Sequence, residues 1–366
     1  MTDDDQKQLE PRADDGWFER LCAWADESDI QEKELPRNKA KLLAMQELWL
    51  NRARFTTLPA EIGQLGNLQG LYLWDNQLTS LPAEIGQLGN LQTLNLWGNE
   101  LSTLPPEIGR LGELQTLNLE SNKLSTLPSE IGQLGNLQKL NLRGNQLTTL
   151  PAAITQLGNL QDITIEGHLL LELIDMAPYL PKLKSLSLFN LTALPAEIGQ
   201  LGNLQRLDLS DNQLSTLPAQ IGQLSNLQEL DLDNNELTAL PDSIGQLGKL
   251  QKLDLRENQL IALPPEIGQL SELRRLDLWD NQLTALPPEI GQLDNLQDLN
   301  LEWNKLTALP PEIGQLGNLK RLYLIRNPLT DLPDSFKRLY LERNGALEIT
   351  LDNKLLDRVL AEILNL

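Results

Sequence analysis

The sequence is poor in the residues from which many catalytic and metal sites are built. Its 366 residues contain one cysteine and one histidine. A single cysteine excludes an internal disulfide and a four-cysteine metal site, and a single histidine excludes sites built from several histidines. We therefore expect no cofactor and no metal, and the scarcity of cysteine fits a reducing, cytoplasmic compartment.

Long apolar runs and basic charge are also scarce. No stretch of eighteen apolar residues occurs, which argues against a membrane-spanning helix. The opening MTDDDQKQLE is acidic and polar, so we expect no signal peptide, although secretion by another route stays open. The 51 acidic and 30 basic residues give a formal net charge of −21. This charge argues against nucleic acid as a partner, because the phosphates would be repelled.

What the sequence has in abundance is a 23-residue repeat. The segment LQGLYLWDNQLTSLPAEIGQLGN (68–90) returns as LQTLNLWGNELSTLPPEIGRLGE (91–113), and further copies follow the pattern LxxLxLxxNxLxxLPxEIGxLxN. The alternating LxL is typical of a half-buried strand whose middle residue points outward. We expect the Asn to bond backbone groups in the turn, LP to begin the return path, and Gly to allow tight bends. The 24 Gly and 21 Pro therefore indicate turns rather than disorder.

These repeats resemble leucine-rich repeats of the 23-residue LPxEIGxL type, which occur in Ras-suppressor and Scribble-like proteins, plant Ras-group-related proteins and many bacterial proteins. The resemblance covers about Met45 to Pro333. It implies an α/β solenoid, a curved horseshoe of about thirteen repeats with a parallel β-sheet on its concave face and helical caps at both ends. It also implies binding to other proteins. The chain has no GxxxxGK[ST] loop, so it lacks the GTPase motif of the similar Roco proteins.

The sequence divides into four predicted segments. Residues 1–15 read as a disordered acidic tail and residues 16–44 as an N-terminal helical cap. Repeats fill residues 45–335, and residues 336–366 hold a truncated repeat followed by a C-terminal cap helix. The residues that follow the repeat pattern in the truncated copy are Phe336, Leu339, Leu341 and Asn344, and those at helical spacing after it are Leu356, Val359, Leu360 and Ile363.

Residues 160–203 depart from the pattern. Here His168 takes the place of the repeat asparagine, LLLELIDMA reads as a short helix that ends near Pro178, and the second copy is 21 residues long. One interpretation is a junction between two duplicated blocks of repeats. The other is a recognition feature, because several distinctive side chains gather here: His168, Met176, Tyr179 and Phe189.

Outward-facing residues that folding does not require are the candidates for function. Two aromatic groups qualify: Trp49, Tyr72, Trp74 and Trp97 in the first repeats, and Trp279, Trp303 and Tyr323 in the last repeats. Tryptophan and tyrosine are favoured anchors of protein interfaces, which suggests partner binding on the concave face. The alternative is that these rings arose by duplication and pack on neighbouring strands.

An aspartate column lies between the two aromatic groups in the sequence, formed by Asp208, Asp231, Asp254 and Asp277. Adjacent carboxylates repel one another, which folding alone would not select. The column would suit a basic segment of a partner, or it could be a solvated row with lateral ion pairs. Cations fit less well, because one carboxylate per strand does not form the oxygen cage that calcium prefers.

The sequence therefore predicts a non-catalytic protein–protein interaction module or scaffold, bacterial and cytoplasmic, that acts as a monomer and binds a protein partner through its concave face. We expect neither nucleic acid nor a membrane as a partner. Catalysis is not expected, because no recognisable motif places a base beside a nucleophile. The alternatives are a secreted bacterial effector or adhesin that targets a host protein, and a structural or designed repeat scaffold.

Overall fold

The computed structural model describes residues 16–343 and 347–352. It divides into two compact units, Met1–Asn159 and Leu160–Leu366, which we describe separately. The predicted tail at 1–15 and the predicted helix carrying Leu356 to Ile363 lie outside the described residues.

The first unit contains a parallel sheet of three-residue strands that pair in chain order. A short 3-10 helix on the return path follows each strand. The strands are β1 (Glu47–Trp49), β2 (Gly70–Tyr72), β3 (Thr93–Asn95), β4 (Thr116–Asn118) and β5 (Lys139–Asn141). The 3-10 helices are η1 (Ala60–Gln64), η2 (Ala83–Gln87), η3 (Pro106–Arg110), η4 (Ser129–Gln133) and η5 (Ala152–Gln156).

The second unit begins with longer elements and then returns to the regular pattern. It opens with β6 (Asp162–Glu166), η6 (Gly167–Leu169), α3 (Leu170–Met176), η7 (Ala177–Tyr179) and β7 (Ser185–Phe189). The regular strands are β8 (Arg206–Asp208), β9 (Glu229–Asp231), β10 (Lys252–Asp254), β11 (Arg275–Asp277), β12 (Asp298–Asn300) and β13 (Arg321–Tyr323). Their 3-10 helices are η8 (Ala196–Gln200), η9 (Ala219–Gln223), η10 (Asp242–Gln246), η11 (Pro265–Gln269), η12 (Pro288–Gln292) and η13 (Pro311–Gln315).

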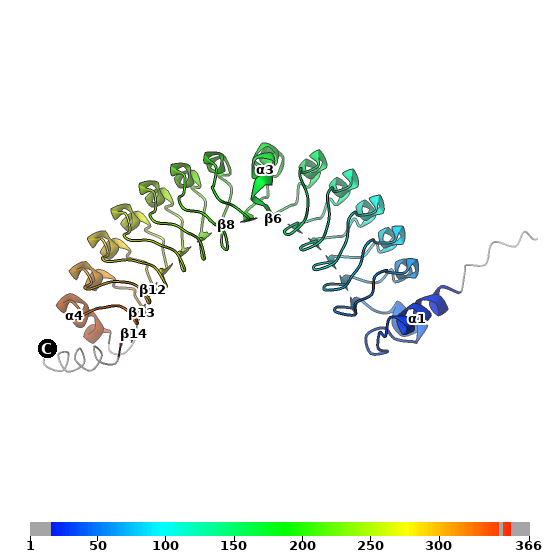
Figure 1. Cartoon of the computed structure of the whole chain (residues 1–366), viewed down its shortest axis with the longest axis horizontal. Coiled ribbons are helices and arrows are strands. Elements are labelled where there is room, and N and C mark those ends of the chain that lie inside the picture. The colour runs from blue at the N-terminus through cyan, green and yellow to red at the C-terminus, as the bar shows by residue number, and fades with distance from the viewer. Residues whose placement is uncertain (1–15, 344–346, 353–366) are drawn as a thin grey trace, which may run out of the picture. The chain divides into compact units, whose positions relative to one another are not determined.

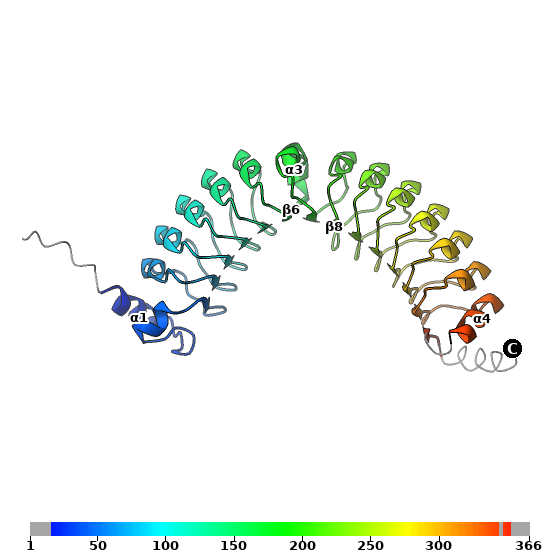
Figure 2. The same cartoon turned by 180° about the vertical axis from the view of Figure 1, so that it is seen from behind.

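Strands and helices occupy opposite sides of each unit. In Figure 1 the strands of each unit line the inner side of its curve and the helices line the outer side, and Figure 2 shows the same arrangement from behind. The predicted solenoid with a parallel sheet on its concave side is thus confirmed within each unit. We call the strand side of a unit its inner face.

The LPxEIG segment forms the 3-10 turn because of its proline and its first glycine. Pro105 has an extended backbone, with φ −66° and ψ 143°, and its carbonyl accepts a hydrogen bond from the Ile108 N–H at 3.0 Å. Ile108 is fully buried. A Cβ on Gly109 would lie 2.5 Å from the Glu130 carbonyl oxygen of the next repeat, whereas Gly112 has open space around it. Close approach of the next turn therefore explains the first glycine, and it does not explain the second.

The repeat asparagines form the predicted ladder. Asn99 is 7% exposed, and its Nδ2 donates to the carbonyl oxygens of Leu73 and Leu96, both at 3.0 Å. Its Oδ1 accepts from the Leu78 N–H, also at 3.0 Å. One side chain thereby pairs backbone groups in its own repeat and in the preceding one, which confirms the prediction made for this column. The same bonding recurs at Asn76, Asn122 and Asn145.

Two helices precede the first strand, α1 (Trp17–Glu27) and α2 (Lys39–Leu43). Helix α1 buries Leu21 and Ala25, and the ring centroid of Trp24 lies 5.2 Å from that of Phe55 in the first repeat. The Trp24 indole N–H donates to the Thr57 carbonyl oxygen at 3.1 Å. These contacts agree with the capping role predicted for residues 16–44, which stays a prediction.

The predicted truncated repeat is a helix rather than a strand. Phe336, Leu339 and Leu341 lie in α4 (Asp334–Glu342), and Asn344 lies outside the described residues. Helix α4 begins 23 residues after the first residue of η13, where the next 3-10 turn would start. Its sequence DSFKRL lacks the glycine found near the end of the regular turn. The helix therefore continues for nine residues. The next strand, β14 (Glu348–Thr350), pairs with β13.

Candidate functional site

The aspartate column is assembled by the parallel register of the second unit. Asp208 pairs with Asp231, Asp231 with Asp254, and Asp254 with Asp277 across β8 to β11. The four predicted residues therefore occupy one row on the inner face, one strand spacing apart.

Each residue of this row also has a structural task that the sequence reasoning missed. Asp208 Oδ1 accepts a hydrogen bond from the Ser210 N–H at 3.0 Å, and Asp231 Oδ1 accepts one from the Asp233 N–H at 3.1 Å. In the first unit Asn95 Oδ1 accepts from the Trp97 N–H at 3.1 Å. Asp and Asn are the residues that make such contacts to the backbone two positions on. Folding therefore selects Asn or Asp, and only the choice of Asp adds charge.

Two of the four aspartates are covered by arginines. Asp254 and Asp277 are 2% and 3% exposed. Arg256 Nε donates to Asp254 Oδ1 at 2.7 Å, and an Arg275 amino group donates to Asp277 Oδ2 at 3.0 Å. The lateral ion pairs considered as an alternative thus account for this half of the column.

The other two aspartates border an open hollow. Asp208 and Asp231 are half-buried, and neither has an ion pair within the part of the chain that the structure describes. A hollow of about 360 Å³ lies against them, bordered by Arg206, Asp208, Glu229, Asp231 and Lys252. The accessible carboxylates of the column are therefore those on β8 and β9.

Asp233, which the sequence analysis did not select, has the most perturbed carboxyl group of this region. Its pKa is raised to about 6, chiefly by burial and in addition by the negative charges of Asp254, Asp231 and Glu257, against the opposing effect of Arg256. Arg256 donates to Asp233 Oδ2 at 3.0 Å, while Asp233 Oδ1 is buried without a hydrogen-bond partner. Burial also raises the pKa of Asp231. Neither perturbation could be predicted without the packing.

This pKa gives a testable dependence of stability on pH. Because the pKa of Asp233 in the folded protein lies above the unfolded value of about 3.8, its contribution to stability is complete only below about pH 3.8. This contribution is lost as the pH rises through about 6. Asp233→Asn should remove this loss and be more stable than the wild type at pH 7 by about 1–2 kcal/mol, after allowing for solvent screening. Urea unfolding at pH 4, 5, 6 and 7 measures the difference. Asp175→Asn, an exposed carboxyl on α3, is the control. An unchanged difference between Asp233→Asn and wild type across this range would contradict the assignment.

The aromatic group of the first unit forms two pairs, one on strands β1 and β2 and one in the segments just after β2 and β3. Trp49 and Tyr72 stack, with centroids 3.7 Å apart and planes at 10°, and Trp49 stays 50% exposed. The Tyr72 ring lies over its own strand, since a Cβ on Gly70 would come within 2.8 Å of Tyr72 Cε2. Trp74 and Trp97 have centroids 5.6 Å apart, and Trp97 is 36% exposed. Each pair therefore shows the ring packing between neighbouring repeats that the alternative interpretation expects, while the Trp49 and Trp97 rings keep solvent-exposed surface.

The aromatic group of the second unit occupies two kinds of position. Tyr323 lies on strand β13, whereas Trp279 follows strand β11. Trp303 has a left-handed backbone with φ 57°, which is strained for so bulky a residue. Its ring is 49% exposed, and the Arg326 guanidinium lies 5.1 Å from its centroid. Trp303 thus lies in a turn rather than on the strand face.

In the irregular segment, residues 160–203, the strands are longer than those of the regular repeats. Strands β6 and β7 pair over five residues, and the predicted helix is confirmed as α3. His168 is exposed in η6, so it does not take over the buried role of the repeat asparagine. The physical reason is that β6 continues two residues beyond the usual length, to Glu166, which is 6% exposed. Phe189 is buried, whereas Tyr179 is 63% exposed.

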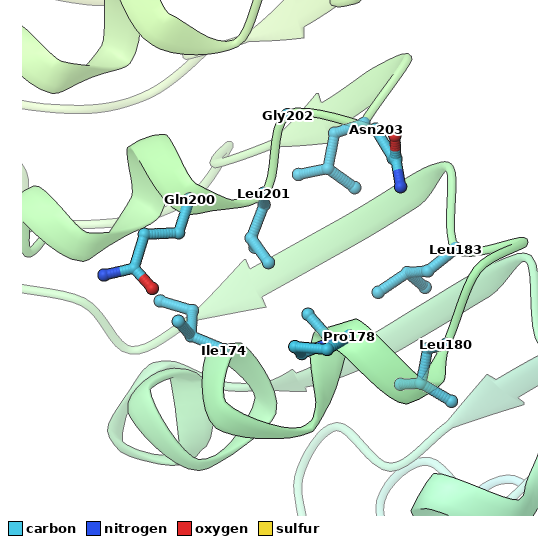
Figure 3. Close-up of a pocket in the computed structure, with 10 residues that line it drawn as sticks. Ile174, Pro178, Leu180, Leu183, Gln200, Leu201, Gly202 and Asn203 are labelled. Carbon is cyan, nitrogen blue, oxygen red and sulfur yellow. The ribbon is translucent and has the colours of Figure 1, made fainter.

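A hollow of about 270 Å³ lies between the α3–η7 segment and the turn after η8 (Figure 3). Ile174, Leu183 and Leu201 contribute apolar walls, and Asn203 lies at the rim. In regular repeats the equivalent Asn donates to a carbonyl of the preceding repeat, as Asn226 does to Gly202 at 2.9 Å. Asn203 makes no such bond within the described residues. Both interpretations of this segment, a junction and a recognition feature, stay predictions.

The fold and repeat geometry agree with the comparisons to known families. The family described as "Leucine-rich repeat region" matches residues 27–119, 174–260 and 264–343, which is more than half of the chain. A second family, "Leucine rich repeat", matches residues 112–170. The chain belongs to the leucine-rich repeat family.

Solved leucine-rich repeat proteins share this fold. One from Leptospira interrogans is 38% identical, with 87% of this chain and 93% of that chain covered and a TM-score of 0.64. An internalin of Listeria monocytogenes is 18% identical, with 92% and 96% covered and a TM-score of 0.59. The Drosophila Toll–Spätzle complex is 23% identical, with 86% and 44% covered and a TM-score of 0.66. The last two show the fold alone. A comparison with curated proteins gives no match.

The leucine-rich repeat array offers little for metal chemistry. Within residues 16–343 and 347–352, no three His, Cys, Asp or Glu side chains are grouped so that they could hold a metal ion. In the same residues, no helix has the length and apolar character needed to cross a bilayer. Leucine-rich repeats are a common protein–protein interaction module, in which the curvature of the solenoid creates an extended binding surface.

Proposed function

We propose that this leucine-rich repeat protein is a non-catalytic interaction module that binds a protein partner across the inner face. The observation that carries the proposal is the exposed tryptophan on the first unit. Trp49 is 50% exposed and Trp97 is 36% exposed, although the repeat core is built from Leu and Ile. Exposed aromatic rings on a rigid sheet are the side chains that anchor protein interfaces.

Charge supports a partner with a basic segment. Asp208 and Asp231 border the hollow on β8 to β10, and neither has an ion pair within the described residues. The whole sequence carries a net charge of −21, which favours encounter with basic surfaces. Asp254 and Asp277 would act less directly, because arginines already cover them.

Affinity capture with matched variants tests the proposal. The double variant Trp49→Ala/Trp97→Ala should keep the fold and weaken recovery of the partner by at least about thirtyfold, since each anchor contributes roughly 1–2 kcal/mol or more. Capture from a native lysate followed by mass spectrometry identifies proteins that the wild type retains and the double variant loses.

The control is Tyr179→Ala, which removes a ring that is 63% exposed but lies outside the strands. It should recover the partner as well as the wild type does. Equal recovery by all three proteins would refute the proposal that Trp49 and Trp97 anchor the partner.

We further propose that the protein acts in the cytoplasm as a monomer. The alternative is an effector or adhesin acting on a host protein, which requires a bacterial source, and the similarity to the Leptospira protein agrees with such a source. Cell fractionation distinguishes the two locations, because export would place the protein in the medium or at the cell surface.

A further inference from the structure

The heptapeptide LWDNQLT occurs twice, at residues 73–79 and 278–284. Both copies fold alike. Asp75 and Asp280 have left-handed backbones, with φ 58° and 52°, and both side chains are exposed. The tryptophan before each aspartate, Trp74 or Trp279, is half-buried. The two copies therefore present the same indole and carboxylate from the same local backbone.

The first copy holds a cation from its own chain. Arg52, in the preceding repeat, places its guanidinium carbon 4.6 Å from the centroid of the Trp74 ring. Its Nε donates to Asp75 Oδ2 at 3.2 Å. A planar guanidinium suits such a site, because it stacks on an aromatic face while its N–H groups pair with a carboxylate.

The second copy has a carboxylate at the position of that arginine. Glu257 lies 23 residues before Asp280, as Arg52 does before Asp75. The backbones agree: Arg52 has φ 58° and donates its N–H to the Trp74 carbonyl oxygen, and Glu257 has φ 49° and donates to that of Trp279. Trp279 and Asp280 are therefore accompanied by an exposed negative charge instead of a guanidinium.

Neighbouring cations of the second unit are already engaged. Arg256 is adjacent to Glu257 in sequence, but its guanidinium donates to Asp254 at 2.7 Å and to Asp233 at 3.0 Å. Arg326 lies over Trp303. Within residues 16–343 and 347–352, no cation lies over Trp279 and none pairs with Asp280 or Glu257.

We propose that Glu257, Trp279 and Asp280 bind an arginine side chain of the partner protein, in the place that Arg52 takes beside Trp74 and Asp75. The indole receives the guanidinium plane, and the two carboxylates accept its N–H groups and balance its charge. This inference names the chemistry of the partner and therefore rests on the proposed function.

Short blocked peptides test the site directly. Acetyl-Gly-Arg-Gly-amide is titrated into the full chain while the indole N–H resonance of Trp279, assigned by Trp279→Phe, is followed by NMR. The arginine peptide should shift this resonance. The neutral citrulline peptide should bind at least about fivefold more weakly, which corresponds to the ~1 kcal/mol of an exposed cation–π contact. The lysine peptide should also bind more weakly, because its ammonium group cannot stack on the indole as a plane or pair with a carboxylate through two parallel N–H groups. Equal responses to the three peptides, or none, would overturn the proposal.

Two substitutions should interchange the response of the two LWDNQLT copies to the arginine peptide. Glu257→Arg supplies the cation from the chain itself, so the arginine peptide should no longer shift Trp279. Glu236→Arg, an equal charge change at an exposed site in the preceding repeat, should leave the response intact. Arg52→Glu removes the guanidinium that lies over Trp74 in the first copy, so the Trp74 resonance should begin to respond to the arginine peptide. A response at Trp279 that survives Glu257→Arg would contradict the inference.

The outcomes separate this inference from the proposed function. If Trp49→Ala/Trp97→Ala loses the partner while Trp279 ignores the arginine peptide, only the arginine site is refuted. If the peptide binds as expected while the double variant retains its partner, the site stands and the aromatic anchor of the first unit is refuted.

Discussion

Asn258→Ala is expected to lower the free energy of unfolding by about 3–5 kcal/mol. Asn258 is 7% exposed, and its Nδ2 donates to the carbonyl oxygens of Leu232 at 2.9 Å and Leu255 at 3.2 Å. Its Oδ1 accepts from the Leu237 N–H at 3.0 Å. Truncation leaves these buried backbone groups without partners, and each such group costs about 1–3 kcal/mol.

Asn295→Ala is the matched control. Asn295 also donates to a carbonyl of the preceding repeat, that of Ser271 at 2.8 Å, but its side chain is exposed and water can replace it. Its loss should cost under about 1 kcal/mol. Urea unfolding followed by circular dichroism gives midpoint and slope, and a lower slope for Asn258→Ala would indicate that the array unfolds in parts. Equal costs for the two variants would refute the role assigned to the buried ladder.

Gly245→Ala is expected to destabilise the protein by about 2–4 kcal/mol. A Cβ at this position would lie 2.6 Å from the Glu266 carbonyl oxygen and 2.8 Å from Gln269 Oε1. The glutamine side chain can move, but the carbonyl belongs to the helix η11 of the next repeat. Relieving the clash would therefore separate two stacked repeats.

Gly248→Ala, three residues later in the same repeat, is the control. Nothing lies within 4 Å of the position its Cβ would take. The substitution should be neutral or stabilising by up to about 1 kcal/mol, because alanine restricts the unfolded chain more than glycine does. Thermal unfolding of both variants measures the contrast. Similar melting temperatures for the pair would show that the close approach at Gly245 carries no energetic weight.

The repeat pattern predicted most of the fold because each of its positions answers a local physical need. Leucines at alternating positions predicted the strands, and the Asn after each strand predicted the ladder seen at Asn99. The pattern was misleading where spacing alone was used. Phe336, Leu339 and Leu341 match the strand spacing, but the absence of a glycine lets a helix continue through them.

The candidate site was only partly predictable, since accessibility depends on neighbours in other repeats. The register of the Asp column was correct, yet burial of Asp254 depends on Arg256, which lies over it. The raised pKa of Asp233 depends first on burial and then on charges in its own repeat and in the next one. The internal comparison of Arg52 with Glu257 was available in the sequence, but its meaning depends on the contacts that Arg52 makes.

The turn after each strand has a consequence for how such proteins diversify. Its left-handed residue is Asp75 in one repeat and Gly98, Ser121, Glu257 or Trp303 in others, with φ between 49° and 68°. The repeat therefore accepts acidic, small or even aromatic side chains at this position, although the left-handed backbone is strained when the residue is as bulky as Trp303. After duplication, single substitutions there can change what one repeat recognises while the hydrogen bonds that hold it to its neighbours persist. The same position offers a route to engineered specificity, one repeat at a time.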